Sequence, residues 1–271
     1  MVEFASKNDE NELKAVWKTV FEDTDFFIDL YFKYNFNPYN TLIFRKNDKI
    51  ASMLFMRHYQ FRFWGEIIPC CYLAGLATLP EFRQQNIMRQ LIKFSDKVLK
   101  ERNIPLAILI PANEKMYNFY QKFDYEQVFE DGQEEIPLEN LIEQHNSIAE
   151  SYGKFDKIYR EKDFCIQKEF TDFQAIIEEW EHDQRPPKTN VAGMAKLIAP
   201  HFLFNIFKQK TGNFLKLHFE KNDKIILENN VLTINNRTLC RLLFGFRTSE
   251  LSPEISAIFP EHKPILNLML E

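Results

Sequence analysis

The 271-residue sequence predicts an α/β (α+β) fold in which two domains are joined by a helical connector. Three observations favour this class. Apolar residues near the N-terminus recur at helical spacing, and from residue 41 onward they alternate as in strands. A long apolar strand then leads through a polar turn into a helix, and Asn-rich turns separate strand-like runs near the C-terminus. The length also fits two domains, since domains usually contain about 100–200 residues.

The N-terminal elements follow from apolar spacing and turn chemistry. The Asn47-Asp48 pair suits a tight turn, so the runs beside it are predicted to form an antiparallel hairpin. Gly75, inside the next strand, is typical of a bulge or of a place where a ligand or another backbone approaches closely. The predicted elements are helices over 11–21 and 25–34 and strands over 41–45, 50–57 and 67–79. A helix that follows the turn at 80–88 and ends at residue 102, a strand over 105–111, a helix over 114–122 and a strand over 125–129 come next.

An acidic run from Glu130 to Glu135 marks the predicted end of the first domain. The domains are expected at 1–132, 133–190 and 191–271, and the middle segment is expected to be a helical connector. Later elements are predicted as helices over 138–152 and 154–183, a break over 184–190, a helix over 193–208, strands over 215–219, 224–227 and 231–234, a helix over 237–244 and an apolar tail over 264–271.

Composition restricts the function classes. Hydrophobic residues make up 45% of the chain and charged residues 27%, which argues against a disordered or disulfide-scaffold protein. A net charge of −5 gives no basic surface for nucleic acid or an acidic membrane, and no apolar stretch is long enough to cross one. Neither the cysteines nor the histidines have metal-ligand spacing, so we expect no metal and a cytoplasmic protein with reduced thiols.

The polar turn that follows the 67–79 strand is the strongest chemical signal. A turn between the end of a strand and the start of a helix presents free backbone N–H groups and the positive end of the helix dipole. Arg83 and Arg89 flank this turn and could add charge-assisted contacts to phosphate oxygens. The turn is therefore predicted to bind a phosphate; the alternative is that both arginines are solvated charges.

Residues 75–92 resemble the acetyl-CoA pyrophosphate loop of GNAT N-acetyltransferases, and the Ile-Met-Arg sequence at 87–89 is most similar to the Eis-type (enhanced intracellular survival) branch. Asn118-Phe-Tyr-Gln-Lys-Phe-Asp-Tyr125 resembles a second GNAT segment at the expected distance. The resemblance covers residues 5–130 and implies a GNAT fold, a mixed and mainly antiparallel sheet flanked by helices. Residues 191–271 are similar to the sterol-carrier-protein-like domain that ends Eis-type chains.

The resemblance implies acetyl transfer from acetyl-CoA to a primary amine by direct attack in a ternary complex. Tyr120 would be the general acid that protonates the leaving thiolate, and Glu271 would supply a carboxylate base. The phosphate loop here departs from the family pattern, since Asn86 and Met88 stand where glycine or alanine is usual. The implied CoA-binding residues are Leu76, Ala77, Thr78, Arg83, Gln84, Gln85, Asn86, Ile87, Met88 and Arg89.

Several alternatives stay open at this stage. Tyr120 could instead only pack its helix onto the sheet, and the loop without glycine is compatible with a non-catalytic acyl-CoA or lipid-binding protein. An interaction protein that uses exposed aromatic residues is a third class. The acceptor, a small molecule or a peptide amine, is not identified, although His58, Tyr59 and Trp64 are candidates for its pocket. A homo-oligomer is also left open.

Overall fold

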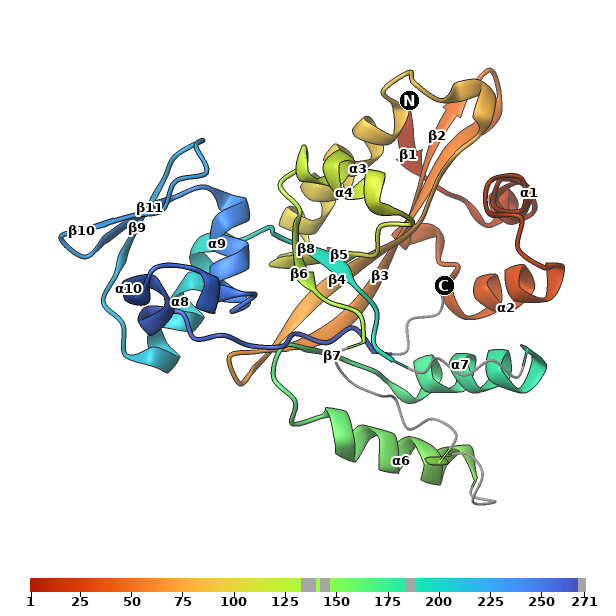
Figure 1. Cartoon of the computed structure of the whole chain (residues 1–271). Coiled ribbons are helices and arrows are strands. Elements are labelled where there is room, and N and C mark those ends of the chain that lie inside the picture. The colour runs from red at the N-terminus through yellow and green to blue at the C-terminus, as the bar shows by residue number, and fades with distance from the viewer. Residues whose placement is uncertain (133–139, 142–146, 184–188, 268–271) are drawn as a thin grey trace.

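The computed structural model describes residues 1–132, 140–141, 147–183 and 189–267. Its main feature is an eight-stranded sheet in the order β1-β2-β3-β4-β5-β8-β6, with β7 paired to the edge of β3 (Figure 1). These strands are β1 (Val2–Phe4), β2 (Thr41–Lys46), β3 (Lys49–Phe63), β4 (Glu66–Thr78), β5 (Leu106–Leu109), β6 (Glu126–Phe129), β7 (Cys165–Gln167) and β8 (Gly193–Leu197).

The sheet is mixed and mainly antiparallel, as predicted: β4 and β5 pair in parallel, and the other neighbours pair antiparallel. Asn47 and Asp48 both adopt left-handed backbone angles in the β2–β3 turn, which is the geometry that a tight hairpin needs. Cys70 and Cys71 are fully buried in β4, as small apolar residues would be.

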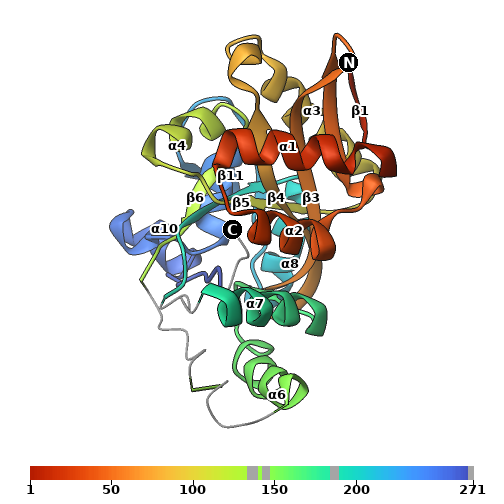
Figure 2. The ribbon, with the colours of Figure 1, turned by 90° about the vertical axis from the view of Figure 1, so that its right-hand side faces the viewer.

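Helices cover both faces of the main sheet. In Figure 2, α1 and α2 lie in front of β3, β4 and β5, and the apolar residues of α3 and α4 pack into a separate cluster on the opposite face. The helices are α1 (Glu10–Phe21), α2 (Asp25–Asn35), α3 (Ile87–Glu101), α4 (Glu114–Gln121), α6 (Ile148–Tyr159), α7 (Phe170–Asp183), α8 (Pro200–Thr211), α9 (Asn236–Leu243) and α10 (Pro253–Ile258). No helix among the described residues has the length and apolarity that crossing a membrane requires.

Two predicted helices are wrong in part. Residues 193–208 begin with the strand β8, and α8 starts only at Pro200, where proline suits the first helical turn. All five residues of β8 are buried, and a short apolar run of this kind cannot be distinguished from a helix by periodicity. The predicted helix over 154–183 is likewise divided by the strand β7.

The C-terminal segment contributes to both sheets. Its small sheet is formed by β9 (Lys216–Phe219), β10 (Ile226–Glu228) and β11 (Val231–Ile234), close to where strands were predicted. However, β8 lies between β5 and β6 in the main sheet. The division at residues 132 and 190 stays a prediction, and a strand from beyond residue 190 completes the N-terminal sheet.

Gly75 produces the bulge that was predicted in β4. Met53 of β3 lies opposite Ala77, but Phe55 lies opposite Ala74, so β4 carries an extra residue there. Gly75 has a φ of +56°, and a Cβ atom at this position would lie 2.7 Å from Trp17 and 2.8 Å from Phe55. Only glycine combines this conformation with this close packing.

A buried ion pair joins α7 to β3. Arg57 Nη2 lies 3.0 Å from Asp172 Oδ1, and the two side chains are 9% and 18% exposed. The Tyr59 ring contacts both Arg57, at 4.9 Å, and the Lys168 ammonium, at 4.5 Å. Burial is the main reason that the pKa of Lys168 falls to about 7.

Replacing Gly75 with Ala is expected to lower the free energy of unfolding by about 2–4 kcal/mol, since the left-handed backbone and the overpacking both add a cost. Gly212 is the matched control: its φ is +68°, but a Cβ there meets nothing within 4 Å, so Gly212→Ala should lose only about 1 kcal/mol. Urea unfolding measures both losses. Equal losses would show that close packing at Gly75 does not matter.

Lys168→Met is expected to change how stability depends on pH. Between about pH 7 and 10.5 the unfolded chain binds a proton at Lys168 that the folded chain does not, so the stability of the wild type rises with pH. The free energy of unfolding of the wild type, relative to that of the variant, should rise by up to about 1.4 kcal/mol per pH unit over this range. Urea unfolding at several pH values tests this, with Lys157→Met as an exposed control; a constant difference would contradict it.

Candidate functional site

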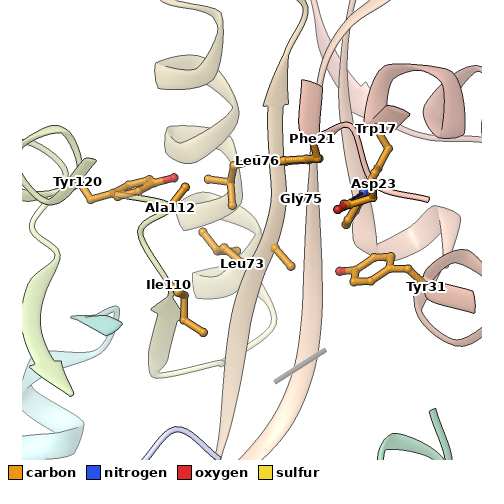
Figure 3. Close-up of a pocket in the computed structure, with 11 residues that line it drawn as sticks. Trp17, Phe21, Asp23, Tyr31, Leu73, Gly75, Leu76, Ile110, Ala112 and Tyr120 are labelled. Atoms are coloured by element: carbon orange, nitrogen blue, oxygen red, sulfur yellow. Dashed lines mark hydrogen bonds between the residues drawn. The ribbon is translucent and has the colours of Figure 1, made fainter. Parts of the chain in front are cut away.

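The cavity that best suits a reaction lies where β4 and β5 diverge. The two strands pair only from Cys70 to Tyr72 of β4, and beyond these residues no described residue of β5 pairs with β4. A cavity of about 270 Å³ occupies this region, and its walls come from α1, α2, β4, α4 and the segment after β5 (Figure 3). It is therefore accessible to groups from both faces of the sheet.

One wall combines aromatic rings with a carboxylate. Trp17, Phe21 and Tyr31 line the cavity, and Asp23, in the loop between α1 and α2, lies beside them. Trp17 Nε1 donates a hydrogen bond of 2.8 Å to Asp23 Oδ2, which fixes the carboxylate (Figure 3). Aromatic faces and a carboxylate both attract an organic cation, so this wall suits a protonated amine.

Tyr120 lies on the other side of β4, with its hydroxyl directed toward that strand (Figure 3). It lies in the last turn of α4, only 5% exposed, and packs against Phe119 and Tyr125. Burial raises the pKa of Tyr120 above its ordinary value near 10, so the phenol is protonated at neutral pH. The residue thus packs in the core and also presents a proton donor to the cavity.

A second cavity, of about 220 Å³, lies at the polar turn after β4. Asn86 adopts the left-handed conformation (φ 56°, ψ 21°) that glycine would adopt, and it makes no side-chain cap on α3. The first N–H groups of a helix have no acceptor within the helix, so those of Ile87, Met88 and Arg89 are donors at the positive end of α3. This geometry suits an oxyanion such as a phosphate.

Contacts within the turn hold its shape. Arg83 Nε donates to the Thr78 carbonyl at 3.1 Å, and Gln85 accepts from Lys46 Nζ at 2.5 Å. Gln85 Nε2 also donates to the carbonyl of Glu81. Arg89 lies over the Phe123 ring at 5.5 Å. The turn is therefore ordered by its own contacts, with Lys46 as a cation that the sequence had not indicated.

The structure brings most of the predicted CoA-binding residues to the two cavities. Leu76 lines the first cavity; Thr78, Arg83, Gln84, Asn86, Ile87, Met88 and Arg89 line the second. Two others lie apart: the Ala77 carbonyl faces β3 and accepts from Ser52 Oγ at 2.6 Å, and Gln85 makes the contacts given above. Glu271 lies outside the described residues.

The three residues that the sequence suggested for the acceptor pocket do not line the cavity that contains Tyr120 and Asp23. His58 and Tyr59 line another cavity, and Trp64 Nε1 donates to the Leu243 carbonyl in the core. Trp17 and Asp23 were not identified from the sequence, because they belong to no motif and only the folding of α1 and α2 onto β4 brings them to the cavity. Among the described residues, no group of histidine, cysteine and acidic side chains is arranged to hold a metal ion.

Comparisons with known proteins are consistent with this geometry. Residues 2–128 match the family model described as an acetyltransferase (GNAT) domain. No curated protein matches the chain.

Solved structures resemble the chain at low identity. A probable N-acyltransferase from Enterococcus faecalis is 17% identical with a TM-score of 0.55, over 73% of this chain and 51% of its own. A GCN5-related N-acetyltransferase from Anabaena variabilis is also 17% identical, with a TM-score of 0.48 over 73% and 50%. Eis1 from Mycobacterium abscessus is 14% identical, with a TM-score of 0.41 over 48% and 32%. The chain thus spans about half the length of the Enterococcus faecalis and Anabaena variabilis proteins. The similarity to the Enterococcus faecalis protein shows a shared fold alone.

The burial of Tyr120 leads to a spectroscopic prediction. The difference between the ultraviolet titrations of the wild type and of Tyr120→Phe gives the phenolate signal of Tyr120. This signal should appear only above pH 10, because burial raises the pKa of this phenol. Tyr39→Phe removes a 78% exposed phenol and serves as the comparison. If this difference signal instead has its midpoint below pH 10, the Tyr120 hydroxyl is solvated.

Proposed function

We propose that this chain, whose residues 2–128 match the family model of an acetyltransferase (GNAT) domain, moves an acetyl group from acetyl-CoA to a primary amine. One observation carries the proposal. The polar turn after β4, the edge of β4 that β5 leaves unpaired and the cavity with Tyr120 and Asp23 follow one another along a single strand. An extended molecule with a phosphate at one end and a reactive group at the other would span them.

Acetyl-CoA has this form. Its pyrophosphate would accept hydrogen bonds from the N–H groups of Ile87, Met88 and Arg89. The pantetheine amides would pair with the free edge of β4 as an added strand does, through Leu76 and the N–H of Thr78. The carbonyls of Ala77 and Thr78 already accept hydrogen bonds from Ser52 and Arg83. The thioester would then lie in the cavity beside Tyr120.

The acceptor would enter from the side of α1 and α2. Asp23, held by Trp17, would bind the ammonium form of the amine, and the faces of Trp17, Phe21 and Tyr31 would favour the same cation. After giving one proton to a base, the amine attacks the thioester carbonyl carbon and forms the new C–N bond. The C–S bond breaks, Tyr120 donates its proton to the departing thiolate, and the second proton that the nitrogen loses restores the Tyr120 phenol. The orientation of the amine toward the thioester supplies most of the rate enhancement, and proton transfer adds about 10²–10⁴-fold.

Three finer assignments stay predictions. They are the Eis-type affiliation, the sterol-carrier-protein-like identity of residues 191–271, and Glu271 as the base that deprotonates the amine. A small amine and a lysine side chain are both compatible with the wall formed by Asp23 and the aromatic rings.

Tyr120→Phe is expected to lower the turnover number about 100-fold or more and to leave acetyl-CoA affinity unchanged, because only the proton donor is lost. The release of free CoA thiol in the presence of a panel of primary amines measures turnover. Tyr117→Phe, on the same helix but outside the cavity, is the control. Full turnover in Tyr120→Phe would leave Tyr120 a packing role only. Acetyl-CoA binding without turnover for any amine would instead favour the non-catalytic acyl-CoA-binding protein.

Asp23→Asn is expected to raise the KM for a cationic amine about 10-fold or more, because a charge-assisted hydrogen bond contributes about 1.5–3 kcal/mol. Asp25→Asn provides the matched control, since Asp25 lies two residues away and is 88% exposed. If both variants keep the KM of the wild type, the amine does not bind at Asp23.

A further inference from the structure

A third cavity, of about 440 Å³, shares no lining residue with the two cavities of the candidate site. It lies at a gap in the outer edge of β3. This edge pairs with β2 up to Phe55 and with β7 from Gln60. Positions 56–59 pair with β4 on the opposite edge, but within the described residues no strand pairs with them on this edge. The volume falls in the range of about 300–1,000 Å³ that small-molecule sites occupy.

One wall of this cavity carries a fixed cation. Arg102, at the end of α3, donates to Asn40 Oδ1 at 2.7 Å and to the Tyr39 carbonyl at 2.6 Å. His58 Nε2 lies 3.4 Å from Arg102 Nη1. A guanidinium has five N–H donors, so Arg102 keeps donors for a ligand after these contacts. Because its position is already fixed, little entropy is lost when it binds an anion.

The segment between β7 and α7 carries the opposite charge. Glu169 and Asp172 both line the cavity, but Asp172 is paired with Arg57. Asp172 Oδ2 also accepts from the Glu169 N–H at 3.0 Å, which fixes the backbone at Glu169. No described residue forms an ion pair with Glu169. The cavity therefore has one anion, Glu169, and one cation, Arg102, whose charges are available to a ligand.

We propose that this cavity binds a small zwitterion with the chemistry of an α-amino acid, whose carboxylate contacts Arg102 and His58 and whose ammonium contacts Glu169. The amides of Gln60 and Gln167 and the hydroxyl of Thr171 supply further polar contacts. Gln167 is fixed, because its Nε2 donates to the carbonyls of Tyr159 and Cys165. A phosphate would be repelled by Glu169, and a simple amine by Arg102.

His58 reports on this site directly. Burial, and then the charge of Arg102, lowers its pKa, and a carboxylate bound between the two side chains would raise it again. The experiment follows the ring proton of His58 by NMR, assigned through its loss in His58→Asn, while each common L-amino acid is added singly. Propionate and ethylamine, which carry only one of the two charges, are added in the same way.

At least one amino acid should move the His58 signal and saturate with a dissociation constant of about 0.1–10 mM. Propionate and ethylamine should bind at least 10-fold more weakly. Glu169→Gln should weaken binding of the amino acid about 10-fold but should not weaken binding of propionate, since the variant removes only a repulsive charge for that anion. Glu181→Gln, at an exposed acid on α7, should change neither affinity. The proposal is overturned if no amino acid moves the signal, if propionate binds as tightly, or if Glu169→Gln has no effect. None of these outcomes depends on acetyl-CoA binding.

Discussion

The divergence of β4 from β5 is the constraint on which the rest of the candidate site depends. Two parallel strands that stayed paired would have no room between them and no free backbone groups. Here the pairing stops at Tyr72 and Ile108, and the bulge at Gly75 follows three residues later in β4. The split exposes one edge of β4 to a ligand and lets side chains from opposite faces of the sheet reach one cavity.

The surrounding core keeps this split open. Trp17 packs closely over Gly75, and its ring also contacts Tyr31 at 4.3 Å and Phe55 at 5.8 Å. The same indole orients Asp23 through its N–H group. One residue therefore fills the space that glycine leaves and positions the charged group of the cavity. On the far side of β5, β8 and β6 complete the sheet, so a segment from beyond residue 190 also supports the site.

Local signals in the sequence predicted the N-terminal fold well. The hairpin turn, the bulge, the polar turn after β4 and the starts of the helices each depend on a few adjacent residues. Asn86 illustrates this: it stands where the family has glycine, and the structure has at this position the left-handed conformation, which asparagine tolerates better than most other residues. Elements that depend on distant partners were not predictable in the same way. The short strands β7 and β8 are defined by pairing with β3 and β5, and Asp23 reaches the cavity only through the packing of two helices.

The central claim is that the turn after β4 binds the pyrophosphate of acetyl-CoA at the start of α3. The most direct test is calorimetric titration of acetyl-CoA into the wild-type protein and into Asn86→Val and Asn86→Gly. Valine is strongly disfavoured at a φ of 56°, and glycine adopts it freely. We expect saturable binding to one site in the wild type and in Asn86→Gly, and binding at least 10-fold weaker in Asn86→Val. Absence of binding to the wild type at millimolar acetyl-CoA, or equal affinity in all three proteins, would contradict this account.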